Sequence, residues 1–183
     1  MYRTWLAAAL LASTIGLGAR AAEGQKDRQA LSEAHDKLAR RAGEYVTVSK
    51  FTTPDGKAME SKGTAKLTLV LGGRFLQEEN AGTLLGMPVN GLRLVGYNTE
   101  ANQFEAVWTY TGSTAMMTLV GQTKDDGRTV EFAASFAGVK NTKSNFTVVY
   151  RFADADNFTV ELIARTEDGT KGPTLETSYT RKK

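Results

Sequence analysis

Few residues in this chain could carry out acid–base, metal or thiol chemistry. There is one histidine, His35, and no cysteine among 183 residues. A Ser-His-Asp triad, a histidine-ligated haem or a zinc site built on histidine would each have to use His35. Because His35 lies on the apolar stripe of a predicted helix, we interpret it as a packing residue. We predict no catalytic residue, no metal site and no cofactor.

Three pairs of adjacent carboxylates are the remaining candidates for proton transfer. The pairs at 125–126 and 167–168 precede glycines and are typical of turns. Glu78 and Glu79 lie on a predicted strand, where neighbouring side chains point to opposite faces. One of them is therefore expected to face the interior, opposite Arg74. A structural ion pair is the favoured interpretation of that carboxylate, and a general acid in a pocket is the alternative.

Aromatic side chains are concentrated on the predicted strands. Most of them are expected to form the core, and some would line a cavity if the fold encloses one. The sequence does not show which strand face is the inner one. The predicted ligand-binding residues are Arg74, Glu78, Tyr97, Trp108, Tyr110 and Met116, with Arg74 as the anchor for an acidic head group.

The stretch GMPVNGLRLVGYN, residues 86–98, resembles a glycine-rich phosphate loop at first sight. A phosphate loop places its glycines between a strand and the start of a helix. Nothing after Gly96 has helical periodicity, so residues 86–91 are interpreted as a hairpin loop. Gly96 is interpreted as a bulge or a point of close packing within a strand.

One helix and a series of short strands are predicted to position these residues. Residues 26–42 repeat apolar side chains at helical spacing, and Gly43 is the expected end of that helix. From residue 44 to 181 the apolar period is two, with turn signals every eight to twelve residues. The pattern predicts an all-β, antiparallel up-and-down meander of about ten strands that closes into a barrel, with the helix at one barrel end.

The N-terminus resembles a secretory signal peptide. Arg3 is followed by an apolar run from Trp5 to Leu17, and residues 19–21 form an A-x-A cleavage site. We therefore expect residues 1–21 to be removed, leaving residues 22–183 as one domain without a stable membrane anchor. A secreted chain without cysteine fits a bacterial periplasmic or secreted protein better than a disulfide-dependent ectodomain.

The charge balance argues against nucleic acid as a partner. Without residues 1–21 the basic residues exceed the acidic ones by one. The one basic run, residues 181–183, is at the C-terminus, whereas nucleic-acid-binding domains carry a concentrated basic face.

Several motifs resemble the bacterial family catalogued as domain of unknown function 1579. They are LGGRFLQEE (71–79), GMPVNGLRLVGYN (86–98), FEAVW (104–108) and the terminal SYTRK. The chain departs from the family pattern at Tyr45, where tryptophan is usual, and at Asn98 and Tyr110, where aspartate is usual. The resemblance implies a calycin-like, that is lipocalin-like, barrel and implies no activity. A haem-binding relative is disfavoured because no predicted strand or loop contains histidine.

These observations favour one function and leave two alternatives open. The favoured hypothesis is a binding protein that holds a small apolar or amphipathic molecule inside the barrel. The alternatives are an isomerase- or hydrolase-like enzyme that acts through Glu78 or a tyrosine at a polar barrel mouth, and an interaction module with a filled interior. The sequence does not indicate an oligomeric state.

Overall fold

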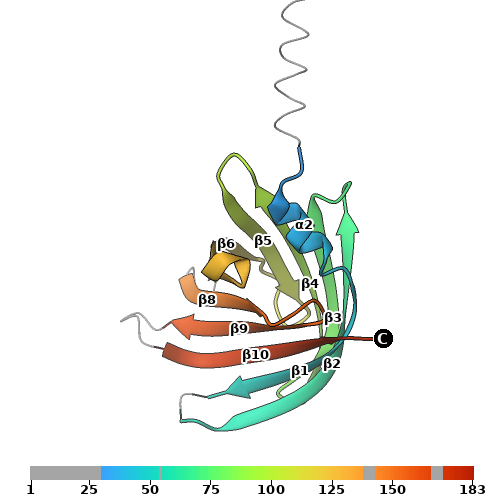
Figure 1. Cartoon of the computed structure of the whole chain (residues 1–183). Coiled ribbons are helices and arrows are strands. Elements are labelled where there is room, and N and C mark those ends of the chain that lie inside the picture. Colours follow the sequence, from blue (N-terminus) through green and yellow to red (C-terminus); the bar gives the residue numbers. More distant parts are fainter. Residues whose placement is uncertain (1–29, 54, 138–142, 166–170) are drawn as a thin grey trace, which may run out of the picture. The chain divides into compact units, whose positions relative to one another are not determined.

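The structure is a computed structural model that describes residues 30–53, 55–137, 143–165 and 171–183 (Figure 1). The predicted signal peptide lies outside these residues. No helix in the described part of the chain has the length and hydrophobicity needed to cross a bilayer.

Ten antiparallel strands form a closed barrel in which each strand pairs with its neighbours along the chain and β1 pairs with β10. The strands are β1 (Gly43–Thr52), β2 (Ala58–Val70), β3 (Phe75–Leu84), β4 (Met87–Asn98), β5 (Gln103–Tyr110), β6 (Met117–Lys124), β7 (Thr129–Ala137), β8 (Lys143–Phe152), β9 (Asn157–Arg165) and β10 (Lys171–Arg181). The predicted all-β, up-and-down barrel is confirmed. Closure pairs every strand on both sides and leaves no open sheet edge.

The helix α2 (Glu33–Ala39) packs against β3 and β4 at one end of the barrel. It is shorter than predicted, because residues 30–32 and 40–42 are not helical. Ser32 begins the helix, and its backbone N–H donates to His35 Nδ1 over 3.0 Å. His35 is buried, and its ring meets Tyr97 edge-on with 6.0 Å between centroids. The interpretation of His35 as a packing residue agrees with these contacts.

Gly43 does not cap the helix, contrary to the prediction. It is the first residue of β1, with a φ of 151°. A side chain there would collide with the guanidinium of Arg181, which donates to the carbonyls of Arg40, Ala42 and Ala155. The close approach of Arg181, rather than helix termination, explains this glycine.

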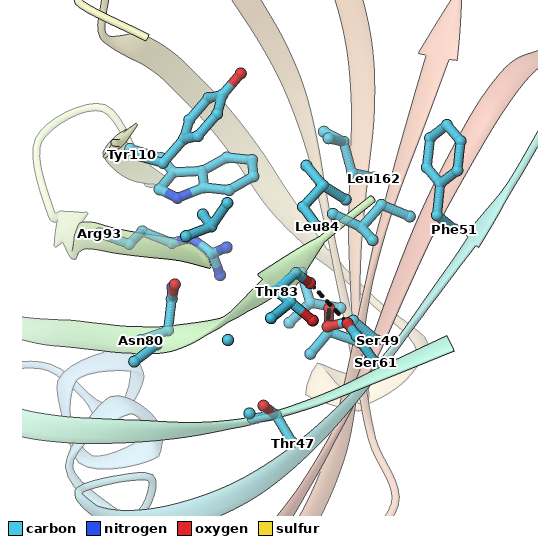
Figure 2. Close-up of a pocket in the computed structure, with 18 of the residues that line it drawn as sticks. Thr47, Ser49, Phe51, Ser61, Asn80, Thr83, Leu84, Arg93, Tyr110 and Leu162 are labelled. Carbon is cyan, nitrogen blue, oxygen red and sulfur yellow. Dashed lines mark hydrogen bonds between the residues drawn. The ribbon is translucent and has the colours of Figure 1, made fainter. Parts of the chain in front are cut away.

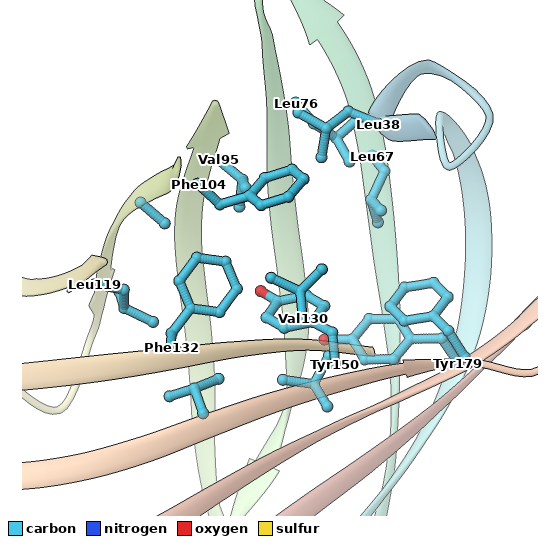
Figure 3. Packing of buried hydrophobic residues seen from close by; sticks show 14 of the residues in the cluster. Leu38, Leu67, Leu76, Val95, Phe104, Leu119, Val130, Phe132, Tyr150 and Tyr179 are labelled. Atoms are coloured by element: carbon cyan, nitrogen blue, oxygen red, sulfur yellow. The ribbon is translucent and has the colours of Figure 1, made fainter. Parts of the chain in front are cut away.

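The hydrophobic core lines the half of the barrel next to α2 (Figure 3). Leu38 of the helix packs with Leu67, Leu76 and Phe104 of the strands in this cluster. Beneath them Phe158 stacks on Tyr179, with ring centroids 4.2 Å apart. The core closes this end of the barrel and leaves the far half for the candidate site.

The strands β2, β3 and β4 extend further than the sequence predicted on the side away from α2. Residues 87–91, predicted as a loop, belong to β4, and Pro88 pairs with Thr83. The actual turn is Leu85–Gly86, and both residues have positive φ, at 53° and 80°. A two-residue turn with both residues in the left-handed region matches the twist of an antiparallel pair, so the strands continue directly to it.

Candidate functional site

The far half of the barrel holds a cavity of about 260 Å³, to which all ten strands contribute (Figure 2). Most of its lining residues occupy inward-facing positions of the strands, whereas Lys62 and Thr83 are exposed and border it at its edge. The interior is therefore not completely filled, which argues against the alternative of an interaction module with a filled interior.

One wall of this cavity is rich in hydroxyl groups. It is formed by the adjacent strands β10, β1, β2 and β3. Ser49 and Thr177 lie 2.9 Å apart through their side-chain oxygens, and Ser61 Oγ donates to the Thr83 carbonyl over 2.7 Å. The polar side chains of this wall are Thr47, Ser49, Ser61, Asn80 and Thr177, and the same strands add the apolar side chains of Phe51, Leu84 and Leu175.

The opposite wall, formed by β5 to β9, is aromatic and aliphatic. Its indole and phenol rings are neighbours, because Trp108 and Tyr110 have ring centroids 5.8 Å apart. The residues of this wall are Trp108, Tyr110, Met117, Phe136, Phe146, Val148, Val160 and Leu162. The cavity thus has one face suited to apolar surface and one suited to hydrogen-bonding groups.

The inner end of the cavity is closed by a buried polar cluster around an ion pair. Arg93 and Glu78 are 4% and 3% exposed, and Arg93 Nη1 lies 3.2 Å from Glu78 Oε2. The other carboxylate oxygen accepts hydrogen bonds from the Tyr179 hydroxyl at 2.8 Å and from Asn80 Nδ2 at 3.1 Å. Arg93 Nη1 also donates to the Tyr150 hydroxyl. The carboxylate is therefore well supplied with donors, as a buried charge must be.

The environment shifts the pKa of three members of the cluster. Burial lowers the pKa of Arg93, but the carboxylate of Glu78 and the nearby tyrosines outweigh burial and raise it overall. Burial raises the pKa of Tyr150 to about 12 despite the opposing charge of Arg93. Burial, and then the Glu78 carboxylate, raise the pKa of Tyr179 well above its usual value. Arg93 is charged and both tyrosines are protonated at neutral pH.

Two donors that are buried behind the lining of the cavity have no partner among the described residues. They are Nε of Arg93 and Nε1 of Trp108. The two residues are register partners on β4 and β5, and the Arg93 guanidinium lies over the indole ring at 5.0 Å from its centroid. Figure 2 shows the Arg93 guanidinium projecting into the cavity.

A second cavity, of about 310 Å³, lies between α2 and the barrel. Its walls include many residues of the hydrophobic core, and Lys37, Arg41 and Arg128 lie around it. Glu78 and Tyr150 line this second cavity, whereas Arg93 and Tyr179 line the first. The polar cluster therefore forms the partition between the two spaces.

The structure brings three of the six predicted binding residues to the first cavity or its partition. Trp108 and Tyr110 line the cavity, and Glu78 lies in the partition. The predicted pairing of Glu78 with Arg74 is wrong, since Glu78 pairs with Arg93 instead. Arg74 lies in the turn before β3, outside the part of the chain whose side chains alternate into the barrel.

Tyr97 and Met116 also lie away from the cavity. Tyr97 packs between His35 and Phe104 at the helix end of the barrel. Met116 precedes β6 and is 65% exposed, and the next residue, Met117, points inward and lines the cavity. A shift of one residue reverses the face that a strand side chain occupies.

The sequence reasoning missed Arg93 and the hydroxyl wall as site residues. The alternation of Thr47 and Ser49 with the exposed valines Val46 and Val48 could have signalled the wall. Such a strand places its polar side chains inward, which is the expected arrangement only where the interior is a polar-lined cavity.

No group of three or more histidine, aspartate or glutamate side chains in the described residues is arranged to hold a metal ion. The donors that face the cavity are suited instead to an organic molecule with a hydrogen-bond acceptor.

The comparisons with known proteins agree with this architecture. The family model described as "Protein of unknown function (DUF1579)" matches residues 30–181. The chain belongs to this family. The family resemblance of the sequence motifs is thereby confirmed. No curated protein sequence matches this DUF1579 protein.

Two solved structures are similar to this DUF1579 protein in fold. Rv2717c from M. tuberculosis has a TM-score of 0.64 at 16% identity, and the match covers 84% of this chain and all of Rv2717c. The S-type phycobiliprotein lyase from Guillardia theta has a TM-score of 0.57 at 11% identity, covering 86% of this chain and 97% of the lyase. At these identities the likeness shows the barrel fold alone.

Proposed function

We propose that this protein binds a small apolar or amphipathic molecule in the cavity between the hydroxyl wall and the aromatic wall. The observation that carries the proposal is a cavity of about 260 Å³ inside the barrel whose two walls differ in polarity. A cavity of about 150 Å³ lined by apolar residues holds one benzene. The cavity between the two walls, at about 260 Å³, therefore suits a molecule of roughly two such rings.

The Glu78 carboxylate supports binding rather than proton transfer. It accepts hydrogen bonds from Arg93, Tyr179 and Asn80 and is nearly inaccessible to solvent. A general acid or base must reach the substrate proton. In this arrangement Glu78 holds Arg93 in place, and Arg93 in turn faces the cavity.

The binding proposal is tested by quenching of Trp108 fluorescence with a panel of fatty acids, isoprenoids and small aromatic compounds. The Trp108→Phe variant supplies the background signal of Trp5. We expect saturable quenching by a subset of small ligands. A flat response across the panel would refute the proposal.

A matched pair of variants on β1 locates the binding site. Ser49 lines the cavity, whereas Val48 is 37% exposed on the outer face. Ser49→Phe places a phenyl ring in the cavity and should strongly weaken the quenching, and Val48→Phe should leave it unchanged. Equal quenching in both variants would place the ligand elsewhere.

We also propose that the protein is exported and acts in the periplasm or outside the cell. The support is the signal-like pattern of residues 1–21. N-terminal sequencing of the chain from fractionated bacterial cells should give Ala22 as the first residue of the exported form. A chain that retains Met1 in the cytoplasm would refute export.

A further inference from the structure

The second cavity, between α2 and the barrel, opens at a basic mouth. Its exposed and half-buried lining residues come from the C-terminal end of α2 and from the turns β6–β7 and β8–β9 with the adjoining strand ends. An added Cβ on Gly127 would lie 2.9 Å from Lys37 Nζ, so the helix and the β6–β7 turn meet there. The charged side chains of this basic mouth are Lys37, Arg40, Arg41, Arg128 and Asp154. Deeper in, the lining is apolar except for Glu78 and Tyr150 of the partition.

The one acidic residue of the basic mouth is engaged in its own turn. Asp154 Oδ1 accepts hydrogen bonds from the backbone N–H groups of Asp156 and Asn157, at 2.7 and 2.8 Å. Arg41 donates to the backbone carbonyl of Asp154 rather than to its carboxylate. The side chains of the other two arginines of the mouth, Arg40 and Arg128, form no hydrogen bond or ion pair among the described residues. The lining of the mouth therefore has an excess of positive charge.

Arg41 connects the basic mouth to the apolar interior. Its guanidinium lies over the ring of Phe152, 4.4 Å from the ring centroid, and both residues line the cavity. Burial lowers the pKa of Arg41 most, and the cations Arg181 and Arg40 lower it further, against the opposing effects of Tyr45 and Asp154. An anion at the mouth would relieve this repulsion between neighbouring cations.

The deep end of the second cavity disfavours an acid. The carboxylate of Glu78 lies there in the partition, where its charge is already compensated by Arg93. A second carboxylate beside it would be an unpaired charge in a desolvated place. At the mouth the same group would meet cations and water. The buried apolar residues in between, such as Leu38 and Phe132, suit an alkyl chain.

We propose that the second cavity binds an amphipathic anion, a medium-chain carboxylate, with its acid group at the basic mouth and its chain among the core residues. The volume of about 310 Å³ is roughly twice that of a cavity that holds one benzene, which corresponds to about twelve non-hydrogen atoms. This inference goes beyond the proposed function, because it assigns a second site on the other side of the partition.

The test compares three probes with the same decyl chain by isothermal titration calorimetry on the full chain. Decanoate is an anion, decanol is neutral and decyltrimethylammonium is a cation. Decanoate should bind most tightly and decyltrimethylammonium most weakly. Because the cations of the mouth are exposed, the advantage of decanoate over decanol should largely disappear between about 0.01 M and about 1 M salt, where the Debye length falls from about 30 to about 3 Å.

Arg128→Gln tests the contribution of one exposed cation of the mouth. The ratio of decanoate to decanol affinity should fall by about two- to fivefold, as expected for one exposed ion pair. Arg128→Lys keeps the charge and should retain most of the ratio. The control Lys50→Gln removes one positive charge from an exposed residue of β1, away from the basic mouth, and should leave the ratio unchanged.

Two measurements show which cavity decanoate occupies. Ser49→Phe places a phenyl ring in the first cavity and should leave decanoate affinity unchanged. In NMR spectra of the full chain the backbone amide signals of Gly127 and Arg128 should shift with decanoate, and those of Ser49 and Thr177 should shift much less.

The outcomes separate this inference from the proposed function. Equal affinity for decanoate and decanol at low salt would overturn the assignment of an anion. Loss of decanoate binding in Ser49→Phe would place decanoate in the first cavity, which overturns the second site and agrees with the proposed function. Absence of decanoate binding would also overturn this inference, and quenching of Trp108 by the fluorescence panel would still decide the proposed function.

Discussion

The buried pair of Glu78 and Arg93 makes a strong prediction about stability. Glu78→Gln keeps the shape of the side chain and one carbonyl oxygen for Tyr179 and Asn80. The substitution removes the charge that compensates Arg93, which is 4% exposed. Removing one partner of a buried ion pair costs about 3–5 kcal/mol, because the other charge is left unpaired. Domains of this size have unfolding free energies of about 5–15 kcal/mol, so the variant should still fold but be measurably less stable than the wild type.

The adjacent Glu79 provides a matched control. Its carboxylate is exposed and accepts a hydrogen bond from Gln77 Nε2 at 2.8 Å. Glu79→Gln should change the free energy of unfolding by no more than about 0.5 kcal/mol. Urea unfolding followed by far-ultraviolet circular dichroism measures both variants without relying on Trp108, which lies beside Arg93.

A double variant separates charge from packing. If the uncompensated cation causes the loss, Arg93→Met in the Glu78→Gln background should recover at least about 1 kcal/mol. The reasoning would be refuted if Glu78→Gln lay within about 1 kcal/mol of the wild type. It would also be refuted if the double variant were less stable than Glu78→Gln alone.

Two further predictions concern alkaline pH and strand packing. Tyr150 and Tyr179 have raised pKa values in the folded state, so the folded chain retains protons that the unfolded chain loses near pH 10. The stabilisation that these raised pKa values provide is fully present below about pH 10. Above that pH the free energy of unfolding should fall by up to about 1.4 kcal/mol per pH unit for each of the two tyrosines. Urea unfolding between pH 9 and 12 measures this loss, and an unchanged slope in Tyr179→Phe would contradict it. At Gly96 an added Cβ would lie 2.5 Å from Cδ1 of Phe75, whereas at Gly82 the nearest atom is 3.6 Å away. Gly96→Ala should therefore cost about 1–3 kcal/mol in the same unfolding assay, and Gly82→Ala should be near neutral; equal effects would contradict the packing argument.

The fold was predictable from the sequence because alternation of apolar residues persists through nearly every strand. The pattern fails where the interior ceases to be apolar. Residues 58–64 and 87–91 carry little hydrophobic alternation, yet they are strands. In β2 the inner face lies by the hydroxyl wall, where Ser61 and Gly63 take the place of the usual apolar side chains. In β4 Val89 lines the cavity, but Pro88 and Gly91 beside it obscure the strand pattern.

The candidate site was predictable only in part. Trp108 and Tyr110 could be proposed because aromatic residues on one strand face suggest a lined interior. The partner of Glu78 could not be identified, because the sequence does not show the register that sets which residue of β4 lies opposite it. In the β3–β4 pairing Glu78 lies opposite Arg93. The same limit applies to Met116 and Met117. Neighbouring strand residues point to opposite faces, so an error of one residue exchanges a side chain that lines the cavity for one that faces solvent.

The most direct test of the account is native mass spectrometry of the protein purified gently from its native host. The wild type and Val48→Phe should carry the same small molecule, and Ser49→Phe should carry much less of it, because its phenyl ring occupies part of the cavity. A bound molecule that persists undiminished in Ser49→Phe, or a wild type that carries none and binds none of the panel, would contradict the claim that the barrel interior is a ligand site.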